Sequence, residues 1–295
     1  MLATSAVLAF LTWLALILAA IPCYLLGREL GGAGTGLKAA AVFLMVPAAH
    51  SFAFQLDAFY PLPAALALYL TVVALRSSPA RATFLGLATG LLVGLALFFN
   101  FNQLALLVLI LLMAGACGLR DDPKQQKAAL LFGTVLVTTL LSGGAALLSS
   151  GLDPGQVLRL GWLDAHIGYV GHRPWGVWAL WNPVAFLLFL GIPASLLLIS
   201  RIRENLAAAV KERTSALRGN GLAVPFLVFI LLLDLSGANR GGEVERLWML
   251  FMPAAVVLAA DRLPGPGTPC ERISIAVLVG LLVIQVAAFH LIFAI

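Results

Sequence analysis

Apolar runs of 18 or more residues follow one another along almost the whole of this 295-residue chain. Each run is long enough to cross the hydrocarbon core of a bilayer as a helix. The runs are continuous and do not alternate with polar residues, which argues against the strands of a membrane barrel. Charged residues make up only 11% of the chain, whereas soluble domains carry about 25%. The sequence therefore predicts an all-α, polytopic membrane protein with a single transmembrane domain over residues 1–295.

Basic residues between the runs predict the orientation of the chain. We expect about ten transmembrane helices, at residues 4–26, 36–52, 60–75, 82–99, 103–119, 128–149, 181–200, 222–237, 246–260 and 274–294. With the N-terminus outside, 14 of the 18 Lys and Arg fall in inner loops, as the positive-inside rule requires. The net charge of +5 thus reflects membrane topology, and we expect no nucleic-acid partner.

Most other polar groups fall on the predicted outer face. The outer loops are expected at about 50–60, 150–180 and 238–246, and the longest inner loop is a basic stretch at 201–221. A basic helix beside anionic lipid is the simple interpretation of the inner loop. Chemistry is therefore expected on the outer side, where the ionisable residues gather.

Asp57 lies in "FQLDAFYP" (54–61), just before the prolines that should begin the third span. It is the sole acidic residue between Glu29 and Asp121. Two interpretations stay open for a carboxylate at this boundary. It is either a loop charge that caps the next helix or an active-site acid, with Tyr60 lining a polar cavity beside it.

A second charged group surrounds the start of the ninth span. Asp234 lies near the end of the preceding span, and Arg240, Glu243, Glu245 and Arg246 follow it. Arginine forms bidentate pairs with phosphate, so a lipid-phosphate site is one interpretation. A self-contained network of ion pairs that fixes the loop is the other.

The loop at 164–175 brings together Asp164, His166, His172 and Arg173. Acidic and histidine side chains can hold a metal, but this spacing matches no standard site. We assign no metal ligand here and keep substrate contact and plain surface as alternatives.

Gly86, Gly90 and Gly94 recur every four residues within one span. This spacing gives a helix a smooth face for close packing, either within the chain or against a partner subunit.

Several of these segments together resemble the GT-C fold membrane glycosyltransferases, which include protein O-mannosyltransferase-like and aminoarabinose-transferase-like enzymes. The resemblance rests on the "GRELGG" inner turn (27–32), Pro47, the outer Asp57 and "ALYL" (67–70). The stretch "SGANRGGEVERLWMLFMP" (236–253) resembles the later half of bacterial members. The resemblance covers nearly the whole chain, and it is one of pattern.

The resemblance implies transfer of a sugar from a polyprenyl-phosphate donor to an acceptor glycan, lipid or protein, with inversion, at the outer face of the plasma membrane. Asp57 would be a catalytic residue at the second acidic position of the family, and Arg246, Arg240 and Arg173 would bind the donor phosphate. The expected substrate pocket comprises Glu245, Glu243, Asp234, His172 and Tyr60. A divalent cation, Mg²⁺ or Mn²⁺, often assists in this family, so the resemblance allows one as a cofactor, while the residues themselves identify none.

One element of the family pattern is missing. Members carry a first acidic motif in a long outer loop after their first span, and this chain has no such loop. We expect that motif upstream of Met1, which would make the chain a fragment. That motif would supply the main base, so the alternative is that the protein is a degenerate relative of the family without it.

Two other functions remain open. A multi-pass transporter or lipid flippase would place ionisable groups at mid-membrane and would break its spans. A non-catalytic membrane subunit would use the glycine face for a partner.

Overall fold

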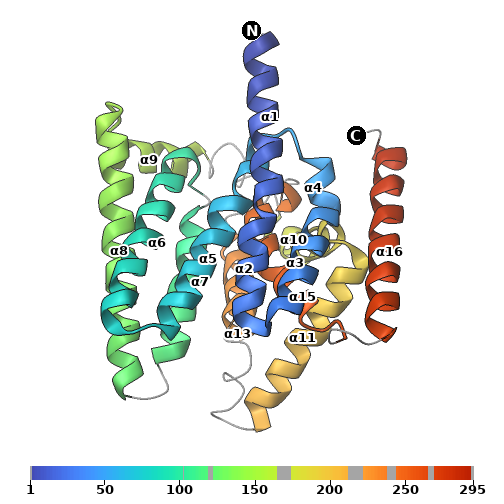
Figure 1. Ribbon diagram of the computed structural model, residues 1–295. Coiled ribbons are helices and arrows are strands. Elements are labelled where there is room, and N and C mark those ends of the chain that lie inside the picture. Colours follow the sequence, from blue (N-terminus) through green and yellow to red (C-terminus); the bar gives the residue numbers. More distant parts are fainter. Residues whose placement is uncertain are drawn as a thin grey trace. The chain divides into compact units, whose positions relative to one another are not determined.

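The computed structural model describes residues 2–101, 103–118, 122–164, 174–211, 222–237, 244–264 and 269–293. Every regular element in those ranges is a helix (Figure 1). Five helices are long and apolar enough to cross a membrane, and a bent pair adds a sixth crossing if it counts as one span. Four shorter apolar helices occupy the remaining expected spans, at Ala33–Met45, Gln103–Ala116, Ala223–Leu235 and Trp248–Ala260. The predicted fold class is confirmed.

The chain falls into two compact units. Unit 1 comprises residues 1–72, 186–224 and 245–295, and unit 2 comprises residues 73–185 and 225–244. The expectation of a single transmembrane domain stays a prediction. We describe each unit by itself.

Unit 1 begins with α1 (Leu2–Leu18), α2 (Ala20–Gly31), α3 (Ala33–Met45), α4 (Pro47–Ser51) and the 3₁₀ helix η1 (Leu56–Phe59). Its later part holds α11 (Ile192–Lys211), η3 (Trp248–Phe251), α15 (Met252–Ala260) and α16 (Pro269–Phe293). Four helices run from one unit into the other: α5 (Pro61–Arg76), α10 (Trp175–Leu190), α13 (Ala223–Leu235) and α14 (Val244–Leu247).

Glycines allow α2 and α3 to form a tight hairpin. A Cβ on Gly27 would lie 2.9 Å from the Cα of Gly36, and a Cβ on Gly36 would lie 2.5 Å from the carbonyl oxygen of Tyr24. Gly32, between the helices, has φ +90°, a conformation that residues with a side chain rarely adopt. The "GRELGG" turn is therefore a packing element.

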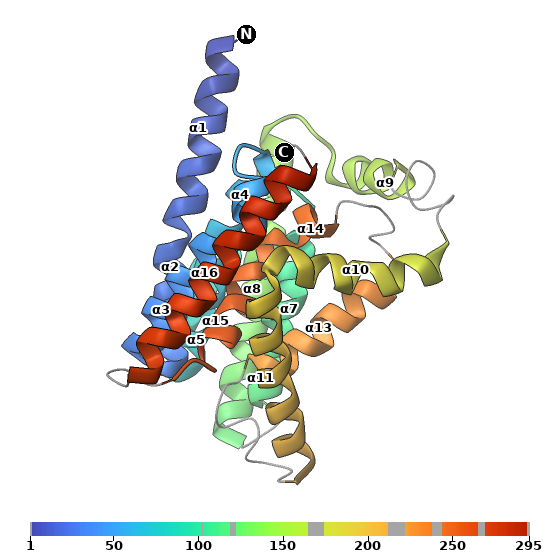
Figure 2. The same ribbon diagram turned by 90° about the vertical axis from the view of Figure 1, so that its right-hand side faces the viewer.

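The span expected over 181–200 is not one straight helix. The direction of the chain bends by 116° between its two halves, α10 and α11, at Gly191, which has φ +99° (Figure 2). A break in an apolar helix leaves backbone groups unpaired. Gln285 of α16 satisfies two of them, because its Nε2 donates to the carbonyl of Leu188 (2.8 Å) and its Oε1 accepts from the N–H of Ile192 (2.8 Å). We call this the Gly191 elbow.

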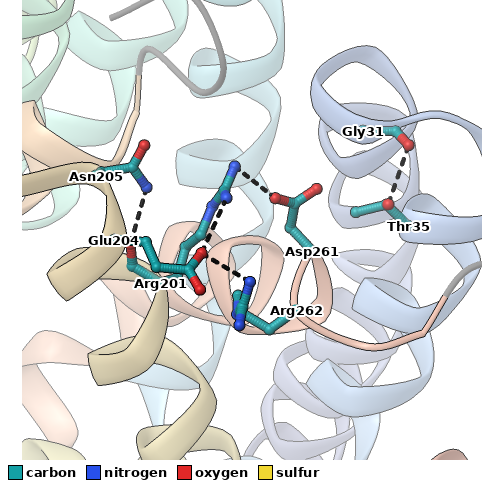
Figure 3. A network of polar contacts seen from close by, with 7 residues as sticks. All are labelled: Gly31, Thr35, Arg201, Glu204, Asn205, Asp261 and Arg262. Carbon is teal, nitrogen blue, oxygen red and sulfur yellow. Dashed lines mark hydrogen bonds and ion pairs between the residues drawn. The ribbon is translucent and has the colours of Figure 1, made fainter. Parts of the chain in front are cut away.

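The middle of α11 is tied to the end of α15 by charged side chains (Figure 3). Arg201 pairs with Asp261 (Nη2–Oδ2 2.6 Å), and Arg262 pairs with Glu204 (Nη1–Oε2 2.7 Å). The side chain of Arg201 is only 18% exposed. The basic stretch at 201–221 therefore begins as a continuation of α11 whose first arginine packs against the protein.

Unit 2 contains α6 (Pro79–Phe99), α7 (Gln103–Gly118), α8 (Asp122–Ser149) and α9 (Pro154–Asp164). The glycine face of α6 packs on α8. A Cβ on Gly94 would lie 2.0 Å from the Oγ of Ser142, and the Oγ1 of Thr139 donates to the carbonyl of Gly90 (3.2 Å). Helix α8 of the same chain thus occupies the surface that a partner subunit would need.

Candidate functional site

Asp57 lies on η1, the short helical turn that leads into α5. Pro61 begins α5 and fixes the direction of the chain directly after this turn. The N–H of Tyr60 donates to the carbonyl of Asp57 (3.1 Å), which closes the turn. The Asp57 side chain is 15% exposed, so it is half-sheltered at the predicted outer boundary.

Arg246 lies on α14 and meets Asp57 across unit 1. The distance from Arg246 Nε to Asp57 Oδ2 is 2.9 Å, and the arginine side chain is 32% exposed. The contact is an ion pair between a carboxylate and a guanidinium. The structure thus brings together the predicted base and the predicted first phosphate ligand, two residues that are far apart in sequence.

Buried aromatic residues hold the two segments that carry this pair. Helix η1 contacts both α1 and η3, and η3 directly follows the helix of Arg246. Trp248 of η3 is 1% exposed and packs on Phe186, with ring centroids 5.6 Å apart. Tyr60 is 3% exposed and meets the ring of Phe59 edge to face. Tyr60 therefore lies beneath the surface and supports the turn.

Asp234 is the candidate that unit 2 contributes. It is 6% exposed, near the end of α13, and its Oδ1 accepts a hydrogen bond from the Nδ2 of Asn182 (3.1 Å). Asn182 is itself 2% exposed. One residue further on, the carbonyl of Leu235 accepts a hydrogen bond from the indole Nε1 of Trp175 (3.3 Å).

Asn182 is not among the residues that the sequence predicted for the site. It is a carboxamide in an apolar run, directly before a proline within the "WNP" of 181–183, and that context was the available signal.

Five other candidates stay predictions. His172, Arg173, Arg240 and Glu243 lie outside the described residues, and only the backbone of Glu245 is described, as part of α14.

The described side chains do not make a divalent-cation site. Among them, no three His, Cys, Asp or Glu residues gather closely enough to hold a metal. Asp57, the acidic candidate in unit 1, faces the guanidinium of Arg246, and a cation is a poor neighbour for a metal ion.

Comparison with known proteins gives one structural likeness. No family model matches the chain, and no curated protein matches it. The crystal structure of the Archaeoglobus fulgidus oligosaccharyltransferase in complex with Zn and sulfate matches 96% of this chain, with a TM-score of 0.60 and 15% sequence identity. The chain spans 41% of the length of that protein. At this identity the likeness concerns the fold alone, and it shows that this chain is an all-α, polytopic membrane protein with a GT-C-like fold.

Proposed function

We propose that this chain acts as a membrane glycosyltransferase of the GT-C type, or as part of one. It moves a sugar from a polyprenyl-phosphate donor to an acceptor glycan, lipid or protein at the outer face of the plasma membrane. The observation that carries the proposal is the Asp57–Arg246 ion pair, because it joins a carboxylate and a guanidinium at a helix start with both side chains partly open to solvent. The GT-C-like fold supports the same function.

The two side chains suit the two ends of the reaction. Asp57 would take the proton of the acceptor hydroxyl as its oxygen attacks the anomeric carbon. The bond from that carbon to the phosphate oxygen breaks, and the leaving phosphate takes the electron pair. Arg246 would stabilise the charge that develops there. A guanidinium has five N–H donors, so one arginine can orient a carboxylate and still bind a phosphate.

A transporter or lipid flippase is the second candidate, and the Gly191 elbow is the observation that favours it. Broken helices in transporters leave backbone groups open to substrate. In this chain Gln285 binds backbone groups on both sides of the break, which favours a structural role for the elbow.

The function is tested by transfer from radiolabelled polyprenyl-phosphate sugars in membranes that contain the protein. We expect Asp57→Asn to lower kcat/KM by about 10²- to 10⁴-fold, the usual contribution of a general base. We expect Arg246→Ala to raise the KM for the donor by about 10- to 100-fold, and Arg246→Lys to lie between it and the wild type.

Asp153→Asn is the matched control. Asp153 is exposed, and its Oδ1 accepts from the N–H of Gly155 at the start of α9 (2.9 Å). Asparagine caps helices as well as aspartate does, so this variant should transfer at the wild-type rate. Wild-type transfer by Asp57→Asn would remove the catalytic role of Asp57. A loss of protein from the membrane in the Arg246 variants, with normal donor KM, would make the pair structural.

A further inference from the structure

Asp234 is a buried acidic residue on an otherwise apolar helix. Helix α13 contains no other charged residue, and Asp234 is 6% exposed. Its partner is the neutral amide of Asn182, and no Lys or Arg of the described chain lies within ion-pair distance of it. A carboxylate has lone pairs for about four hydrogen bonds, so one amide N–H leaves most of them to another donor.

A buried carboxylate with a neutral partner costs more free energy than is needed to join two helices. Burying a carboxylate beside a neutral partner carries a large desolvation penalty, and a neutral amide in its place would make the same contact to Asn182. Ionisable residues within membrane spans are rare for this reason and mark functional sites by default. The acid is therefore expected to meet a ligand that donates hydrogen bonds.

Helix α10 contributes Asn182 and also Trp175 to the contact with the end of α13. Trp175 and Asn182 are seven residues apart, so they lie on one face of α10. The Trp175 indole N–H is used by the carbonyl of Leu235, which fixes the ring beside the residue that follows Asp234. Trp175 is nevertheless 43% exposed, so part of the indole is open.

We propose that Asp234, Asn182 and the indole of Trp175 form a binding site for sugar hydroxyl groups. A carboxylate accepts from one hydroxyl, and a carboxamide can both donate to and accept from the next, so the two together match neighbouring hydroxyls on a pyranose ring. The apolar face of the same ring packs on an indole, which offers a large rigid apolar surface.

The inference rests on the proposed function, because the sugar is the one that the transferase moves or the one that receives it. Both sources present the same chemistry, a ring with neighbouring hydroxyls. The site lies in unit 2 and contains neither residue of the Asp57–Arg246 pair, which lies in unit 1.

Binding to the purified, lipid-reconstituted protein separates the sources. The probes are a polyprenyl phosphate without sugar, the same lipid with its sugar, and a free oligosaccharide acceptor, each followed by calorimetry. The test variant is Asp234→Asn, whose side-chain oxygen can still accept from Asn182, so the contact between the helices survives.

We expect Asp234→Asn to bind the sugar-free lipid as the wild type does. It should bind one of the two sugar-bearing probes, either the lipid with its sugar or the acceptor, about 10- to 100-fold more weakly than the wild type does. This is the loss expected when hydrogen bonds to a charged group are removed. The probe that loses affinity identifies the source of the sugar. Trp175→Phe keeps an aromatic ring and should retain most of the affinity, whereas Trp175→Leu should lose it.

Wild-type affinity of Asp234→Asn for both sugar-bearing probes would overturn the inference, and so would equal loss for the sugar-free lipid. If Asp234→Asn does not accumulate, the Trp175 pair tests the same site from α10, and equal binding by its two members would overturn the inference. If the protein transfers sugar and Asp234→Asn binds both sugar-bearing probes with wild-type affinity, the proposed function stands and this site does not. Binding that depends on Asp234 in a protein without transfer activity leaves the sugar site standing without the proposed function.

Discussion

Two buried glutamines show at the level of single residues how this chain treats polar groups in apolar surroundings. Gln285 uses both of its amide atoms to bond backbone groups on either side of the Gly191 elbow. Gln103, at the start of α7, is fully buried, and neither its Nε2 nor its Oε1 has a hydrogen-bond partner among the residues that the structure describes. Glutamine therefore stabilises the folded protein at position 285 and destabilises it at position 103.

Leucine at each position should have opposite effects. Gln285→Leu leaves the carbonyl of Leu188 and the N–H of Ile192 without their partner, and we expect it to lower the free energy of unfolding by about 2–4 kcal/mol. Gln103→Leu removes two unbonded polar atoms and should be neutral or stabilising. Thermal unfolding in detergent measures both, and a similar shift for the two variants would contradict this account.

The sequence indicated the candidate site residues one by one. Asp57 was recognisable as an isolated acid at a span boundary, and Arg246 as one charge in a crowded loop. Their pairing depends on how η1 and η3 pack on each other, which no spacing along the chain records. The bond from Asn182 to Asp234 escaped prediction for the same reason.

Helices pack in this protein through surfaces that the sequence shows well. The glycine spacing of α6 predicted a close contact, and the structure identifies α8 as the helix that makes it. The hydropathy of the runs predicted where the apolar helices lie, because crossing a membrane requires continuous apolar composition.

Alanine at two glycines separates close packing from helix propensity. Gly94→Ala adds a methyl group where Ser142 and the backbone of Thr139 already lie, and we expect it to destabilise the protein by about 1–3 kcal/mol. Gly133→Ala, on α8, meets no atom within 4 Å and should stabilise by about 0.5–1 kcal/mol. The midpoints of thermal unfolding should therefore move in opposite directions, and a stable Gly94→Ala would show that the contact between α6 and α8 is loose.

The Gly191 elbow was missed, because hydropathy reports composition and carries no information on direction. The signal was nonetheless present in "LGIP" (190–193), where a glycine is followed by a proline two residues later. Glycine is favoured just after a helix ends and proline in the first turn of the next, so this pair marks a helix boundary inside an apolar run.

At the scale of the whole molecule, the orientation in the membrane is open to direct measurement. The positive-inside rule places the turn of Gln55 outside and that of Ser78 inside, and both residues are exposed. With the three native cysteines replaced by alanine, a membrane-impermeant maleimide should label Gln55→Cys in intact cells and Ser78→Cys only after the membrane is opened. The reverse pattern would invert the topology and place the Asp57–Arg246 pair in the cytoplasm.

The Asp57–Arg246 contact also restricts how many times the chain between these two residues can cross the membrane. Two residues that touch at a membrane boundary lie on the same side, so the chain between them must cross an even number of times. In the part of the chain that the structure describes, six apolar segments separate these two residues, and the pair α10 and α11 is one of them. If the other five each cross once, the elbow must amount to one crossing, because a segment that entered and returned would leave an odd total and carry Arg246 away from Asp57. A single ion pair thus constrains how the bent helix passes through the bilayer.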